Sequence, residues 1–143
     1  MRMKKFGSLA VAAFSLALAA CEDPLGTGGV PVSFSLTNRP SPDYAVSSES
    51  PRTVTVRGTF GFSGCDEADP GARVEGNTVI FRLEMERHSE CPMALQILGY
   101  RAQISNIPAG TYQVRVEHVG TTDAWDGPPL PDGVRFTGNV TVE

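Results

Sequence analysis

The fold is decided by residues 73–85, whose sequence is RVEGNTVIFRLEM. After Gly76-Asn77, apolar residues alternate with charged ones along the chain: Val79, Phe81, Leu83 and Met85 on one face, Arg82, Glu84 and Glu86 on the other. This period of two predicts a strand with one buried face. A Gly-Asn pair between two such segments is typical of a two-residue hairpin turn. The stretch therefore predicts two antiparallel strands, at residues 73–75 and 78–85.

The same alternation predicts five more strands: residues 30–36, 54–62, 100–104, 112–116 and 134–142. Residues 38–51 are rich in Pro and Ser and predict a loop. No segment after residue 20 has the pattern of a long amphipathic helix. Seven short strands separated by turn signals predict an all-β protein, an antiparallel sandwich over residues 30–143.

Residues 1–20 have the pattern of an export signal. A basic start is followed by an apolar run of about a dozen residues, shorter than the roughly 20 that a membrane-spanning helix needs. The end of this run, Leu18-Ala19-Ala20-Cys21, resembles the bacterial lipobox. The resemblance implies cleavage before Cys21 and acylation of Cys21, and several acyl chains anchor a protein stably. The alternative is ordinary cleavage after Ala17-Leu18-Ala19, which leaves Cys21 as a free thiol.

The lipobox resemblance implies where the protein is located. We expect an extracytoplasmic protein, anchored through lipid at Cys21 to the bacterial cell membrane or outer membrane. Residues 21–29 form the lipidated cysteine and a flexible, glycine-rich tether.

The charge of the mature chain excludes several functions. Without the three basic residues of segment 1–20, nine arginines and no lysine stand against sixteen acidic residues, a net charge of −7. The absence of lysine excludes a Schiff base or a lysine general base. The negative charge argues against nucleic acid as a partner.

Two cysteines remain when Cys21 is lipidated. In an exported chain, Cys65 and Cys91 predict a disulfide. Their Cα atoms must then lie within about 7 Å of each other. The Gly76-Asn77 turn permits this, because the strand after it returns to the end of the domain from which Cys65 emerges. The connections after the strands at 54–62, 78–85 and 112–116 should then share that end.

Residues 107–114, Ile-Pro-Ala-Gly-Thr-Tyr-Gln-Val, resemble the tyrosine corner of Ig-like and fibronectin type III-like domains. The resemblance implies a seven-stranded Ig-like β-sandwich in which the Tyr112 hydroxyl bonds back across the preceding connection. The chain departs from antibody domains at two positions. Its only tryptophan, Trp125, lies in an expected loop, and Val114 occupies the position of the second antibody cysteine.

The shared end of the three connections is the candidate binding site. It gathers acidic residues from the first connection, His88 from the second, and a tryptophan flanked by carboxylates from the third: Asp66, Glu67, Asp69, His88, Asp123, Trp125 and Asp126. An exposed aromatic with flanking carboxylates can stack on a sugar or anchor a protein contact.

Catalytic and metal-binding motifs are scarce. Met85, His88, Cys91 and Met93 are soft ligand types, but Met85 is expected in the core and Cys91 in the disulfide. The acidic cluster lacks an ordered calcium-ligand pattern. A serine or cysteine hydrolase needs a histidine base; only His88 and His118 could serve, and no nucleophile elbow lies near either.

We therefore expect a cell-envelope binding or accessory module, without catalytic activity, cofactor or metal, whose partner is an envelope protein or a glycan. The alternative is a metal-handling or hydrolytic protein that uses His88.

Overall fold

The computed structural model describes residues 29–40, 43–88, 96–123 and 132–143. These residues form eight strands: β1 (Val32–Thr37), β2 (Ala45–Ser50), β3 (Thr53–Phe62), β4 (Glu67–Glu75), β5 (Thr78–His88), β6 (Gln96–Ile104), β7 (Gly110–Asp123) and β8 (Gly133–Val142). The described part of the chain contains no helix, so the all-β prediction is confirmed. None of its segments is a helix long and apolar enough to cross a membrane.

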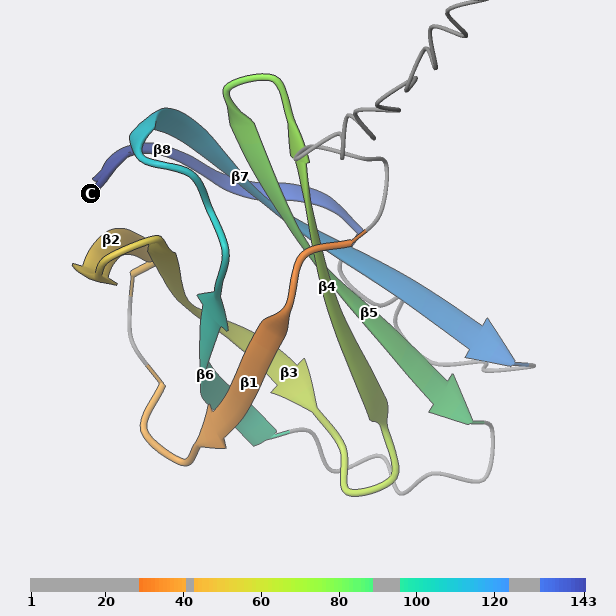
Figure 1. Cartoon of the computed structure of the whole chain (residues 1–143). Coiled ribbons are helices and arrows are strands. Elements are labelled where there is room, and N and C mark those ends of the chain that lie inside the picture. Colours follow the sequence, from red (N-terminus) through yellow and green to blue (C-terminus); the bar gives the residue numbers. More distant parts are fainter. Residues whose placement is uncertain (1–28, 41–42, 89–95, 124–131) are drawn as a thin grey trace, which may run out of the picture.

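The strands form two four-stranded sheets (Figure 1). One sheet has the order β1-β6-β3-β2 and the other the order β4-β5-β7-β8. Apolar side chains from both sheets form one core, among them Val56, Phe81 and Tyr100. The molecule is therefore a two-layer, sandwich-like β-protein, with one face of each sheet in the core and the other in solvent.

The strand count of seven is wrong, because the expected loop at residues 38–51 contains β2. This strand pairs antiparallel with β3, through Ala45↔Arg57 and Val46↔Val56, at the edge of its sheet. Its sequence, AVSSES, carries little apolar alternation. An edge strand whose outer face meets water needs few apolar residues, so the pattern did not indicate it.

The hairpin between β4 and β5 has the predicted turn. Glu75 and Thr78 form the last pair of the ladder, and Gly76 adopts a left-handed φ of 59°. Glycine adopts this conformation without the steric cost that a side chain would add. The strand β5 therefore returns to the end of the sheet where β4 began, as predicted.

Three strand-to-strand connections share one end of the molecule. The strands β5 and β7 are parallel, so His88 and Asp123, which are paired in register, end side by side. At the same end, Phe62 of β3 lies opposite Gln96 of β6, and only four residues join β3 to β4. Figure 1 shows β3, β5 and β7 pointing toward the same side. We call this end the loop end; the three strands that precede the connections end there, as predicted.

The parallel pairing of β5 with β7 differs from the Ig arrangement, whose sheets are antiparallel. The tyrosine corner itself is present. The Tyr112 hydroxyl donates a hydrogen bond of 3.0 Å to the carbonyl oxygen of Pro108, across the β6–β7 connection. Tyr112 is buried, so this bond fixes the start of β7 against the core.

The core contains one histidine. His118 of β7 is fully buried among the rings of Tyr44, Phe60 and Tyr100. Its Nε2 lies 3.1 Å from the Tyr100 hydroxyl, and its Nδ1 has no hydrogen-bond partner within the described residues. His118 therefore belongs to the interior, as the alternation along β7 indicates, and is far from the solvent that a general base would need.

Candidate functional site

An acidic surface covers the outer face of β4 and β5 near the loop end. Glu84, Glu86 and His88 alternate with buried residues along β5 and therefore share its outer face. From β4, Glu67 lies opposite Glu86 and Asp69 lies opposite Glu84. We call these five residues the acidic patch: Glu67, Asp69, Glu84, Glu86 and His88.

The acidic patch lies on strands, although Glu67 and Asp69 were expected in a loop; Asp66 does lie in the β3–β4 connection. The strand β4 begins at Glu67 and runs through Asp69, Pro70 and Gly71. Asp, Pro and Gly are poor strand formers, which explains the prediction of a loop. The strand β4 is at the edge of its sheet, where a proline can be accommodated.

Two pairs of like charges face each other across the β4–β5 ladder. Side chains directly opposite one another are roughly 5 Å apart at Cβ, and like charges in this arrangement are destabilising. Arg82 forms an ion pair of 2.8 Å with Glu84. Among the described residues, no arginine lies within ion-pairing distance of Glu67, Asp69 or Glu86. The end of the patch that carries His88 therefore concentrates negative charge.

His88 lies between two of these carboxylates. Its Nε2 is 4.0 Å from Oε1 of Glu67, and its Nδ1 is 4.0 Å from Oε1 of Glu86. One ligand atom from each of these three side chains can be chosen so that all lie within 4.8 Å of one another. The arrangement joins an imidazole on one strand with carboxylates from two strands.

A hollow of about 280 Å³ lies against the patch. Four carboxylates line it together with Met85 and Thr121; they are Glu67, Asp69, Glu84 and Glu86. The walls are therefore mainly oxygen donors, suited to a cation or to a ligand with hydrogen-bond donors. Among the described residues that line it, the hydroxyl of Thr121 donates to the carbonyl oxygen of Met85.

Asp66 is separate from the patch, because its carboxylate is buried. Arg87 donates to it from Nε (2.8 Å) and from Nη2 (2.5 Å), and the two side chains are 1% and 2% exposed. The backbone N–H and the hydroxyl of Ser63 donate two more hydrogen bonds, of 2.8 and 3.0 Å. Asp66 thus joins the β3–β4 turn to the end of β5 and is not available to a ligand.

The environment of Asp66 keeps it ionised. Burial alone would raise the pKa of this carboxyl, but hydrogen bonds from Arg87 and Ser63 outweigh burial and hold the pKa below its usual 3.8. The bond to Asp66 likewise raises the pKa of Arg87. Arg87 follows Met85 on the inward face of β5, so alternation alone could have placed it inside.

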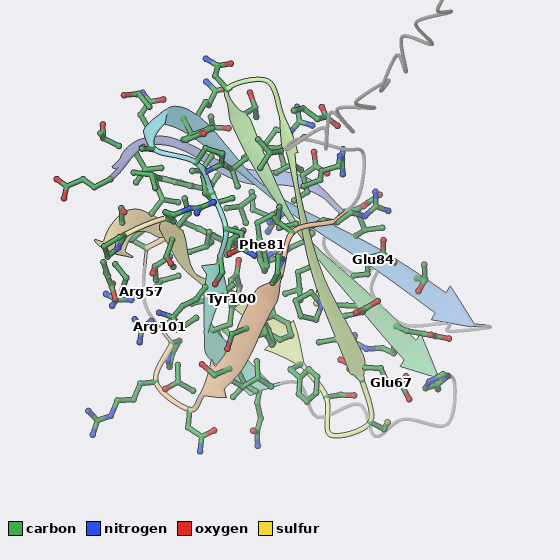
Figure 2. All side chains as sticks on the ribbon, viewed as in Figure 1. Arg57, Glu67, Phe81, Glu84, Tyr100 and Arg101 are labelled. Atoms are coloured by element: carbon green, nitrogen blue, oxygen red, sulfur yellow. The ribbon has the colours of Figure 1, made fainter. Side chains whose placement is uncertain are left out.

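The opposite face of the molecule carries arginines. Arg57 of β3 and Arg101 of β6 lie side by side, and both form ion pairs with Glu49 of β2. Figure 2 shows these arginines on one side of the molecule and Glu67 and Glu84 on the other, with Phe81 and Tyr100 between. The two outer faces therefore differ in charge, and the acidic one lies next to the loop end.

Several predicted site residues lie outside the described residues: Cys21, Cys91, Trp125 and Asp126. The disulfide and the tryptophan contact therefore stay predictions. Asp123 is at the end of β7, in register with His88. Cys65 is two residues before Glu67, and in the sequence Cys91 is three residues after His88; Glu67 and His88 lie at the same end of the β4–β5 ladder.

The chain matches no protein-family model, no curated protein and no solved structure.

Proposed function

We propose that the protein is a lipid-anchored module of the bacterial cell envelope that binds a partner through its loop end and has no catalytic activity. The observation that carries the proposal is the convergence of three connections at one end, bordered by the acidic patch and its hollow. Loops that meet at one end of a rigid β-scaffold are a common binding arrangement. The described residues around the hollow offer no nucleophile with a base, which favours binding over hydrolysis.

The chain enters the domain at the end opposite the loop end, which supports the proposal that the loop end faces a partner. Val32, at the start of β1, pairs with Ile104, the last residue of β6. Gln96, the first residue of β6, belongs to the loop end. A tether from an acylated Cys21 therefore joins the domain away from the loop end, which stays free to meet a partner.

The relation to Ig-like domains is part of the same proposal. The Tyr112–Pro108 hydrogen bond supports it, and the parallel β5–β7 pair marks the difference. On this view the chain shares with Ig-like modules the use of connections at one end of a sandwich for recognition.

The proposal predicts that contacts in the cell envelope form at the loop end. A photo-reactive amino acid at Thr121, which borders the hollow, should give a discrete cross-linked product in intact cells. The matched control is the same amino acid at Ser35, exposed on the outer face of the other sheet. Equal products from both positions, or none from Thr121, would contradict the proposal.

A further inference from the structure

Three side chains meet at the loop-end side of the acidic patch: those of Glu67, Glu86 and His88. We propose that Glu67, Glu86 and His88 bind one divalent transition-metal ion of the zinc class, with water completing its coordination. The proposed metal site lies at the same loop end as the proposed partner-binding site, and this location is all that the inference takes from the proposed function.

The geometry is close to what such an ion requires. Metal–ligand distances of about 2.0–2.1 Å place the donor atoms of a tetrahedral site roughly 3.3 Å apart. The donor atoms of Glu67, Glu86 and His88 lie within 4.8 Å of one another, and the two carboxylate–imidazole distances are 4.0 Å. These are partly or fully exposed side chains, so small rotations about their side-chain bonds can close the remaining gap. The backbone ladder that carries them, with Glu67 opposite Glu86, need not move.

The donor types select the class of ion. Carboxylates alone suit calcium and magnesium, whereas an imidazole nitrogen suits zinc and its transition-metal neighbours. His88 supplies that nitrogen, from the same strand face as Glu86. Three protein ligands leave a coordination position open on a tetrahedral ion, and the adjoining hollow of about 280 Å³ gives water or a partner's donor group access to it.

Electrostatics favours a bound cation at this position. The opposed Glu67–Glu86 and Asp69–Glu84 pairs repel each other across the ladder, and within the described residues only Glu84 among them has an arginine partner. A divalent ion between Glu67 and Glu86 would turn this repulsion into attraction. Binding of a cation would therefore relieve the repulsion between these carboxylates, which solvent alone only screens.

Zinc titration of the untagged full chain in detergent, followed by calorimetry, tests the inference. We expect one zinc ion per chain. His88→Ala should lower the zinc affinity by about 100-fold or more, because loss of a residue that only hydrogen-bonds to a metal ligand already costs about 10–100-fold in affinity. The control is Glu75→Gln, which removes one negative charge, as Glu86→Gln does, from the same face of the hairpin but at the far end of the β4–β5 ladder, outside the acidic patch; the zinc affinity of this variant should stay within about threefold, because charges so far apart are screened. Calcium should bind more weakly than zinc, and His88→Ala should not change calcium binding.

Two results would overturn the inference: no zinc binding by the folded wild-type chain, or zinc binding that is unchanged in both His88→Ala and Glu86→Gln. Circular dichroism of each variant checks folding, which exposed substitutions should leave intact. The cross-link from Thr121 is measured separately and needs no added metal. If the cross-link forms and zinc does not bind, the metal site is wrong and the proposed function stands. If zinc binds and no cross-link forms, the proposed function is wrong and the metal site stands.

Discussion

Replacement of Asp66 by alanine is expected to lower the free energy of unfolding by about 3–5 kcal/mol, as measured by urea denaturation at neutral pH. The substitution removes a carboxylate that accepts four hydrogen bonds, two of them from the buried Arg87 guanidinium. Removal of one partner from a buried ion pair is strongly destabilising, because the remaining charge stays away from water. The destabilised region should be the β3–β4 turn, which Asp66 joins to the end of β5.

The control for this prediction is Arg73→Gln, which breaks the exposed pair between Arg73 and Glu75 on the same hairpin. Exposed pairs contribute about 0–1 kcal/mol, so this variant should unfold almost as the wild type does. If Asp66→Ala cost as little as Arg73→Gln, the Asp66–Arg87 pair would not be buried in the native protein. Asp66 also makes stability pH-dependent: its depressed pKa adds stability at neutral pH that is lost as the pH falls below its usual value of 3.8.

The second large effect is a loss of stability in mild acid that comes from His118. Burial lowers the pKa of His118 from 6.5 to about 4, and Arg135 adds a smaller effect in the same direction. Burial also raises the pKa of Tyr100, so its hydroxyl stays protonated beside Nε2 of His118, 3.1 Å away. The protonated imidazolium would carry an N–H on both ring nitrogens, and the one on Nδ1 has no acceptor within the described residues.

The direction in which stability changes with pH follows from the pKa of His118 in the folded and in the unfolded chain. Above pH 6.5 His118 is neutral in both the folded and the unfolded chain and contributes no pH dependence. Between pH 6.5 and about 4, the unfolded chain binds a proton that the folded chain does not, so stability falls as the pH falls. A shift of this size corresponds to about 3 kcal/mol, fully lost near pH 4.

His118→Gln isolates this effect, because glutamine is polar and similar in length but does not titrate. The difference in unfolding free energy between wild type and variant should change by about 3 kcal/mol between pH 7 and pH 4. Comparison at each pH removes the contribution of carboxylates common to both proteins. A constant difference across this range would mean that His118 is protonated as easily in the fold as in the unfolded chain.

Much of the fold could be predicted from local alternation. The alternation along β5 and the Gly76-Asn77 turn predicted the β4–β5 hairpin. Because the turn reverses the chain, the hairpin also predicted that β5 ends at the same end of the molecule as β3. The strand β2 and the first half of β4 could not be predicted, because both lie at sheet edges, where few apolar side chains are needed. The parallel pairing of β5 with β7 was also missed. Alternation tells which face of a strand is buried, but it does not tell which strand lies beside it.

The candidate site could be predicted as an end of the molecule but not as a set of contacts. Alternation along β5 placed Glu84 and Glu86 on one face, yet their opposition to Asp69 and Glu67 depends on the register of β4, which was expected to begin only at residue 73. For the same reason Asp66 was grouped with the exposed acids. Its pairing with Arg87 requires knowledge that the two residues meet across the end of the ladder.

The intact mass of the protein from the membrane fraction tests most directly whether this is an exported, lipid-anchored domain with a Cys65–Cys91 disulfide. We expect a chain that has lost residues 1–20, begins at an acylated Cys21, and gains the mass of two hydrogens when the Cys65–Cys91 bond is reduced. A soluble product that begins at Ala20, with free thiols at Cys65 and Cys91, would contradict it.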